Sequence, residues 1–302
     1  DVDFGGQHWH SILVGGLGKG GNRYFALDVT NPSAVTDEAT AASKVLWEFG
    51  APQMGFTYGK PIITKTKAFG GAWLVILASG YNNADGHGYL YFVRASDGVL
   101  LKTMTTAALD SGSAGTPSGL AHPAGYTEDF RNQLTEQIYA GDLLGDFWRF
   151  DINDANDANW TVGKMARLLD PSDNPQPVTT PPQIEVDITN GIDRWVFVGT
   201  GKLYDDTDLP DHQIQTMYAL RDGDQTAPLA FPGPFPLSWH SAGMQLIPHT
   251  LSTNFGLTNK PDKGWYDNLP GGASGQRIVV APQAALSVVA YVGTSAQDDP
   301  CL

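Results

Sequence analysis

The residues best suited to chemistry form a short loop with several oxygen ligands. Glu128, Asn132 and Glu136 stand at positions 1, 5 and 9 of an EF-hand-like loop, and Leu134 offers a backbone carbonyl at position 7. Calcium prefers oxygen ligands of this kind. Position 3 is Phe130, however, and no glycine supplies the sharp turn of an EF-hand loop. The pattern predicts a degenerate calcium loop, and a solvated polar loop is the alternative.

Two further clusters of ligand-type side chains occur along the chain. A dense acidic segment could hold a cation or face a basic partner, although a solvated loop explains it as well; its members are Asp205, Asp206, Asp208 and Asp211. His8 and His10 lie two residues apart, a spacing that would point both rings to one face. A transition-metal site needs a third ligand, and none is visible nearby in the sequence.

Motifs for enzymatic chemistry are missing or out of context. The segment 16–21, GLGKGG, matches the dinucleotide fingerprint, but an aromatic strand follows it where a helix must begin. A flexible hairpin connection explains it better. No Gly-x-Ser-x-Gly, Walker, His-Glu-x-x-His or Cys-x-x-Cys pattern occurs. Hydrolase, nucleotide-hydrolysing and zinc-enzyme functions therefore lack the residues to carry them, and we expect a protein that is not an enzyme.

The tryptophans fall into two groups. Those of the first group recur at repeated strands and are expected in the core and between sheets; they are Trp9, Trp47, Trp73, Trp148 and Trp195. Trp239 and Trp265 lie in a long insertion and are better candidates for stacking on a sugar. These two residues carry the alternative that the protein is a glycan-binding lectin.

Charge and composition limit the partners. The formal net charge is -14, and an acidic surface repels DNA, RNA and anionic lipid. The sequence has no uninterrupted apolar run long enough for a membrane span, and its start, DVDFGG, has no signal-peptide character. We expect no nucleic-acid partner and no membrane insertion. The single cysteine, Cys301, suggests a partner cysteine beyond it and an oxidising compartment.

A repeated pair of strands organises the chain. Each copy joins a fully apolar strand, through a glycine turn, to a strand with an aromatic residue. The copies are 11–29, 73–98, 137–152, 195–224 and a shortened one from Val288. Radial repetition of such units closes a β-propeller without long exposed edges. We therefore expect residues 1–302 to be one all-β propeller domain.

The most complete copy predicts a four-stranded blade, and the two ends of the chain predict partial ones. Its inner, second, third and outer strands are expected at 59–64, 73–78, 89–95 and 99–106. The first copy has strands at 11–14, 23–29 and 45–49 with none before them, and the last has only 277–281 and 287–292. Long insertions rich in turn residues are expected at 110–136, 169–182 and 225–275. Such loops on a rigid scaffold are where binding usually occurs.

These stretches resemble the C-terminal propeller domain of the PilY/PilC family, large proteins associated with the tip and assembly of bacterial type IV pili. The resemblance spans almost the whole chain in family order and is most specific at YAGDLLGDFWRFD, residues 139–151. The other matching stretches are HWHSILVGGLGKGGNRYFALDVTNPS, KVLWEFG, MGFTYGKPII, ILASGYNNADGHGYLYFV, NPQPVTT, VFVGTGKLY, KGWYDNLP and RIVVAPQAAL.

The resemblance implies a modified, seven-bladed β-propeller with long inter-strand insertions, incomplete at both ends of this chain. It implies a non-enzymatic role in pilus assembly, retraction control and surface adhesion. The implied partners are minor pilins of the tip complex and a host or abiotic surface. The implied location is the periplasm, the outer surface or the pilus tip of a Gram-negative bacterium.

The resemblance also bears on calcium. The family's Asp-x-Asp-x-Asp-x-x-x-Asp loop falls here on Glu128, Phe130, Asn132, Leu134 and Glu136. The longer arm of glutamate changes the loop geometry, and a phenyl group replaces one ligand. We therefore expect calcium binding to be weak or absent, and no other cofactor.

One enzymatic alternative remains, a PQQ-type quinoprotein dehydrogenase. Its propellers share the glycine turn followed by an aromatic residue and an aspartate. Those enzymes commonly need a vicinal cysteine pair, which a single terminal cysteine cannot supply.

Overall fold

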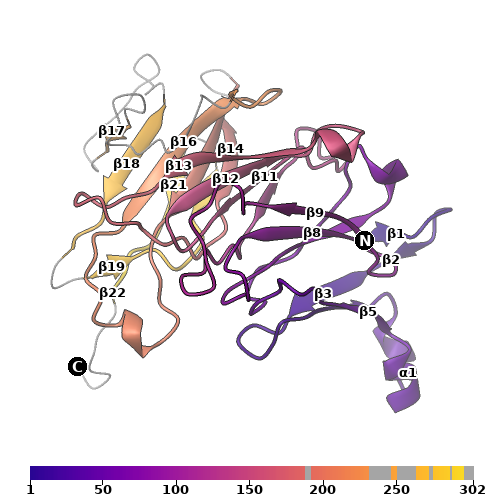
Figure 1. The fold of residues 1–302 in the computed structure, drawn as a ribbon. Helices are drawn as coiled ribbons and strands as arrows, with labels where there is room; N and C mark the ends of the chain where they lie inside the picture. The colour runs from indigo at the N-terminus through magenta and orange to yellow at the C-terminus, as the bar shows by residue number, and fades with distance from the viewer. Residues whose placement is uncertain (188–191, 231–245, 250–262, 272–274, 286–287, 296–302) are drawn as a thin grey trace. The chain divides into compact units, whose positions relative to one another are not determined.

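The structure is a computed structural model that describes residues 1–187, 192–230, 246–249, 263–271, 275–285 and 288–295. Within these residues, helix is limited to the five-residue α1 (Glu38–Ala42) and to short 3-10 turns, among them Phe69–Gly71 and Asp206–Asp208. All other regular elements are β-strands (Figure 1). The predicted all-β class is confirmed. No helix in the described part of the chain is long and apolar enough to cross a membrane.

The chain divides into two compact units. The first comprises Asp1–Tyr139 and Arg149–Val162, and the second comprises Ala140–Trp148 and Gly163–Leu302. The expectation that 1–302 forms one domain stays a prediction.

The first unit contains the four-stranded sheet that the sequence outlined most fully. Strands β6 (Ile62–Thr64), β7 (Leu74–Ala78), β8 (Tyr89–Arg94) and β9 (Leu100–Thr105) pair in this order, each antiparallel to the next. Every residue of β7 is buried. A strand covered on both faces is continuously apolar, which is why its sequence, LVILA, shows no alternation. The four predicted strands are confirmed, with slightly shorter bounds.

A three-stranded sheet precedes it in the chain. Strands β3 (Ile12–Gly16), β4 (Tyr24–Asp28) and β5 (Val45–Phe49) form an antiparallel meander. The glycine segment 16–21 connects β3 to β4 as a hairpin loop, in which Gly18 has φ +56°. This confirms the hairpin interpretation of GLGKGG and leaves no helix to receive a dinucleotide. Ahead of the sheet, β1 (Val2–Asp3) pairs with β2 (Trp9–His10).

Two further sheets contain the remaining long strands. One has the order β10-β11-β12-β13, formed by Ala124–Tyr126, Gln137–Gly141, Asp146–Asp151 and Thr161–Arg167. The other has the order β14-β15-β16-β18-β17, formed by Gln183–Asp187, Asp193–Gly199, Thr216–Asp224, Gly264–Asn268 and Ile247–Pro248. The predicted insertion at 169–182 lies between β13 and β14, whereas the one at 110–136 contains β10, which the sequence did not predict as a strand. The described part of 225–275 contributes β17 and β18.

The last strands differ from their prediction. Residues 277–281 and 287–292 were expected as two neighbouring strands, but β19 (Gln276–Arg277) pairs with β22 (Thr294–Ser295), and β20 (Gln283–Ala285) pairs with β21 (Val288–Ala290). Val280, Val288 and Val292 are each more than half exposed. Apolar β-branched residues favour a strand, but without a sheet covering them these segments form only two- and three-residue ladders.

The cores use tryptophan as expected, with one exception. Trp47, Trp73, Trp148 and Trp195 are each less than 9% exposed. The indole N–H of Trp47 donates to the carbonyl of Ala95 at 2.8 Å, so its polar atom is satisfied. Trp9 is 56% exposed, and its assignment to the core is wrong. A two-residue strand at a small hairpin places it on the surface.

Candidate functional site

The predicted calcium loop connects β10 to β11 in the first unit. The backbone of Lys65 holds it on both sides, since its N–H donates to the carbonyl of Gln133 at 3.1 Å and its carbonyl accepts from the N–H of Thr135 at 2.9 Å. The hydroxyl of Thr64 adds hydrogen bonds to the Gln133 carbonyl, at 2.9 Å, and to the Thr135 hydroxyl, at 2.8 Å. Gln133 itself has φ +57°. The loop is thus tied to the segment after β6 by the protein's own polar groups.

The predicted ligands lie in different environments. Glu128 is exposed and Glu136 is buried. The side-chain oxygen of Asn132 accepts from the N–H of Leu134 at 2.8 Å. Phe130, at position 3 of the predicted loop, is 81% exposed.

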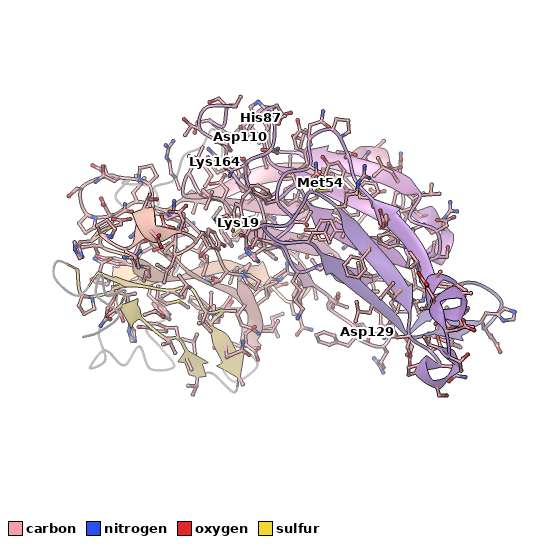
Figure 2. All side chains as sticks on the ribbon, turned by 90° about the horizontal axis from the view of Figure 1, so that it is seen from below. Lys19, Met54, His87, Asp110, Asp129 and Lys164 are labelled. Carbon is pink, nitrogen blue, oxygen red and sulfur yellow. The ribbon has the colours of Figure 1, made fainter. Side chains whose placement is uncertain are left out.

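The negative charge of Asp129, in the same loop, is compensated by an arginine two residues away. The Asp129 carboxylate accepts from the Arg131 guanidinium at 3.0 Å (Asp129 is labelled in Figure 2). Among the described residues, no group of three or more His, Cys, Asp or Glu side chains could hold a metal ion. Calcium takes six to eight oxygen ligands, so the donors of this loop fit it poorly.

The most specific motif, at 139–151, forms the tight turn between β11 and β12. One oxygen of the Asp142 carboxylate accepts from the N–H groups of Leu144 and Asp146, both at 2.9 Å. Its other oxygen accepts from the indole N–H of Trp148 at 2.9 Å. Gly145 has φ +78°, with the carbonyl of Leu168 only 2.5 Å from where a Cβ would stand. Asp142 and Gly145 are therefore needed to close this turn, and both are buried.

A buried ion pair lies beside the turn. The ammonium of Lys164, on β13, is 2.7 Å from the Asp146 carboxylate, and both side chains are less than 9% exposed. The same ammonium lies 5.1 Å from the centre of the Trp148 ring (Lys164 is labelled in Figure 2). The ammonium of Lys164 thus balances the buried negative charge of Asp146, and it makes a cation–π contact with Trp148.

The environment changes the acidity of Asp142. Burial, reinforced by the charge of Asp146, raises the pKa of its carboxyl to about 8, although the hydrogen bonds from Trp148, Asp146 and Leu144 act in the opposite direction. The motif therefore holds a protonatable carboxyl inside the second unit. The hydrogen bonds to its carboxylate close the turn, so the motif acts as a structural clasp.

The first unit contains a polar cluster that the sequence did not single out. The His87 ring nitrogen lies 2.7 Å from the Asp110 carboxylate, which also accepts from the Thr106 hydroxyl at 2.6 Å (Figure 2 labels His87 and Asp110). Burial raises the pKa of Asp110, but these hydrogen bonds outweigh it and hold the pKa below its usual value. The cluster clasps the loop after β7 to the loop after β9. Its histidine lies within one of the family-like stretches, but nothing local indicates its partner.

The acidic segment after β15 is held by the protein's own cations. The Asp208 carboxylate accepts from the N–H of Tyr204 at 2.7 Å and lies 2.8 Å from the Lys202 ammonium. The Arg277 guanidinium donates to the carbonyls of Asp208 and Asp211, both at 2.5 Å. Three of the four aspartates, Asp205, Asp206 and Asp208, thus form a capped 3-10 turn, and Asp211 follows it.

The remaining candidates do not assemble into sites. His10 lies 3.1 Å from Asp28 and stacks on Phe4, while His8 is exposed. Trp265 is 9% exposed and packs in a core with Phe197 and Ile278, so it offers no platform for a sugar. Trp239 and Cys301 lie outside the described residues.

Successive antiparallel meanders of about four strands, joined by long loops, are the architecture of a β-propeller. A model of the PilY1 β-propeller domain matches residues 1–232, and this chain belongs to that family. The predicted propeller fold and family are thereby confirmed. The number of blades stays a prediction.

Individual relatives agree with the family assignment. The chain is 28% identical over 287 residues to a type IV pilus biogenesis factor PilY1 homolog of Xylella fastidiosa, covering 90% of this chain and 21% of the relative. It is 30% identical over 251 residues to type IV pilus biogenesis factor PilY1 of Pseudomonas aeruginosa strain UCBPP-PA14, covering 74% and 20%. The chain therefore spans about a fifth of the length of these relatives.

A solved structure gives the same result. The crystal structure of the Pseudomonas aeruginosa PilY1 C-terminal domain matches with a TM-score of 0.75 and 25% identity, covering 97% of this chain and 66% of that one. The relatives are named as biogenesis factors, not as enzymes. Neither the quinoprotein nor the lectin alternative gains support from these comparisons.

Proposed function

We propose that this chain is the propeller module of a larger protein that supports assembly of type IV pili and controls their retraction. The observation that carries the proposal is the family match, which begins at residue 1 and runs through 232. In this role the module presents loops on rigid sheets to minor pilins of the tip complex, and to a host or abiotic surface during adhesion. It acts in the periplasm, on the outer surface or at the pilus tip, without entering the membrane.

The hydrogen bonds that hold the loops support a binding role for the module. The clasps at Asp142 and at Asp110 tie turns and loops to their sheets with several hydrogen bonds each. Loops held in this way stay in one arrangement, which lowers the entropic cost of binding a partner. The chain also lacks the sequence motifs of hydrolases and zinc enzymes, and we infer that its role is not enzymatic.

The proposal is tested by deleting the codons for residues 1–302 from the gene of the full-length protein and counting pili on the cell surface. We expect surface pili to be lost while the cellular level of the major pilin is unchanged.

We expect no calcium affinity in the micromolar range at the loop 127–136. Only one of its glutamates is buried, and the oxygen of Asn132 already accepts a backbone hydrogen bond. The measurement is calorimetric titration of calcium into chelator-treated protein, with Glu136→Ala as the matched variant. A micromolar site that disappears in Glu136→Ala would show that the loop does hold calcium.

A further inference from the structure

Two tryptophans meet at a groove in the first unit. Trp9, on β2, and Trp73, just before β7, approach edge to face with ring centroids 6.5 Å apart and an interplanar angle of 73°. Trp73 is buried, whereas Trp9 is 56% exposed. Both line a cavity of about 390 Å³, together with Phe4. One indole thus forms the floor of the groove and the other an accessible wall.

The groove also has a cationic side. The Lys65 ammonium lies 5.4 Å from the centre of the Trp73 ring. Arg94 lines the same cavity, with its guanidinium 2.8 Å from the Asp97 carboxylate. The carboxylate of the groove, that of Asp3, accepts from the N–H groups of Gly5 at 2.9 Å and Gln7 at 3.3 Å. Among the described residues, no carboxylate lies within ion-pair distance of Lys65. A chain of net charge -14 therefore presents a cation beside exposed aromatic surface here.

The backbone keeps the groove open. Its rim is the turn Phe69–Gly71, whose residues have φ of +61°, +65° and +79°. A Cβ at Gly70 or Gly71 would meet no atom within 4 Å. This left-handed conformation favours glycine, and with no side chains at these two positions the rim stays open to solvent.

A second cavity extends the surface. It has about 380 Å³, shares Trp73 with the first, and is lined by Ile63 and by Phe130, which is 81% exposed. Lys65 follows directly after β6, whose residues line the second cavity. An occupant in contact with both cavities is therefore longer than a single ring.

We propose that this groove binds an acidic oligosaccharide. The apolar C–H face of a sugar stacks on the exposed indole of Trp9, and a uronate or sialate carboxylate on the same sugar ring meets the Lys65 ammonium. One acidic sugar unit thus satisfies both features of the groove, whereas a glutamate-rich peptide satisfies only the cations. The inference concerns a binding property of this chain and does not rest on the proposed pilus function.

The test is calorimetric titration of the full-length protein with oligogalacturonate, oligomannuronate and sialyllactose, and with a neutral malto-oligosaccharide of matched length. We expect at least one acidic sugar to bind, the neutral one to bind much more weakly, and the affinity to fall as salt is raised. Lys65→Gln removes a charged donor and should weaken binding roughly tenfold. Trp9→Ala removes a stacking face and should weaken it roughly fivefold to tenfold.

The matched control is Lys19→Gln, which removes an exposed lysine on the β3–β4 hairpin loop (Figure 2) and should leave the affinity unchanged. Circular dichroism checks folding, and Trp9→Gln replaces Trp9→Ala if the latter fails to fold. The proposal is overturned if none of the three acidic sugars binds, or if their binding is unchanged in Lys65→Gln and the Trp9 variant. Equally tight binding of poly-glutamate would also overturn it and would indicate a site for acidic peptides.

Discussion

Replacing Lys164 with methionine is expected to lower the free energy of unfolding by about 3–5 kcal/mol. Methionine keeps most of the apolar volume of lysine but removes the ammonium that lies 2.7 Å from the Asp146 carboxylate. Because that carboxylate is almost fully buried, the variant must bury a charge that has lost its ammonium partner, or protonate it. Urea-induced unfolding followed by tryptophan fluorescence measures the change.

The matched control is Lys102→Met. Lys102 lies 3.0 Å from the Asp157 carboxylate, but both side chains are about one-third exposed. Solvent screens such a pair, so its loss should cost less than about 1 kcal/mol. In Lys164→Met combined with Asp146→Asn, the charge left behind is removed, and part of the stability should return. A cost for Lys164→Met no larger than that of Lys102→Met would show that the buried pair does not stabilise the second unit.

Replacing Asp142 with alanine is expected to cost about 3 kcal/mol or more, because two backbone N–H groups and the Trp148 indole lose their acceptor in a buried turn. Asp142→Asn keeps one carbonyl oxygen and is expected to cost less. The aspartate uses one oxygen for the two backbone N–H groups and the other for the indole. The asparagine amide has a single oxygen, so it can keep only one of these two sets of hydrogen bonds.

The asparagine variant also isolates a pH effect. The pKa of Asp142, raised to about 8, exceeds its value in the unfolded chain, so the folded protein binds a proton that the unfolded chain releases. The stabilising contribution is complete below the unfolded pKa of roughly 4 and declines as pH rises to 8, by at most about 1.4 kcal/mol per pH unit. The stability of the wild type relative to Asp142→Asn should therefore fall between pH 5 and pH 8.

Asp170→Asn is the control for this comparison. Asp170 closes a similar turn, accepting from the N–H groups of Ser172 and Asn174. Burial raises its pKa, but the hydrogen bonds from Asn174 and Gln213 outweigh burial and hold the pKa below its usual value. Because the pKa is lowered and not raised, Asp170 stays ionised in both the folded and the unfolded chain near neutral pH, so the difference between wild type and Asp170→Asn should be constant from pH 5 to pH 8. The same constancy for Asp142→Asn would contradict a raised pKa at Asp142.

The strands and turns that a short residue pattern determines were predicted most reliably from the sequence. The run Leu74–Ala78 is apolar at every position, and such a run bounded by turn residues indicates a strand buried on both faces. The turn at Asp142 could be predicted in the same way, since aspartate and glycine at this spacing favour a tight turn. The hairpin role of the segment 16–21 followed from the aromatic strand after it.

Contacts between segments distant in sequence could not be predicted. Nothing local indicates that Lys164 pairs with Asp146 or that Arg277 organises the acidic turn at Asp208, because strand pairing and packing bring these groups together. The exposure of Trp9 could not be predicted for the same reason. An aromatic residue in a strand does not show which face of its sheet is left uncovered. The groove beside it became visible only with the structure.

Surface piliation tests the central claim most directly, because the claim is that residues 1–302 form a module needed for type IV pili. In a strain whose full-length protein lacks these residues, surface pili counted by electron microscopy should fall to the level of an assembly-deficient strain. Immunoblots must show the shortened protein and the major pilin at normal levels. Normal piliation in that strain would contradict the claim.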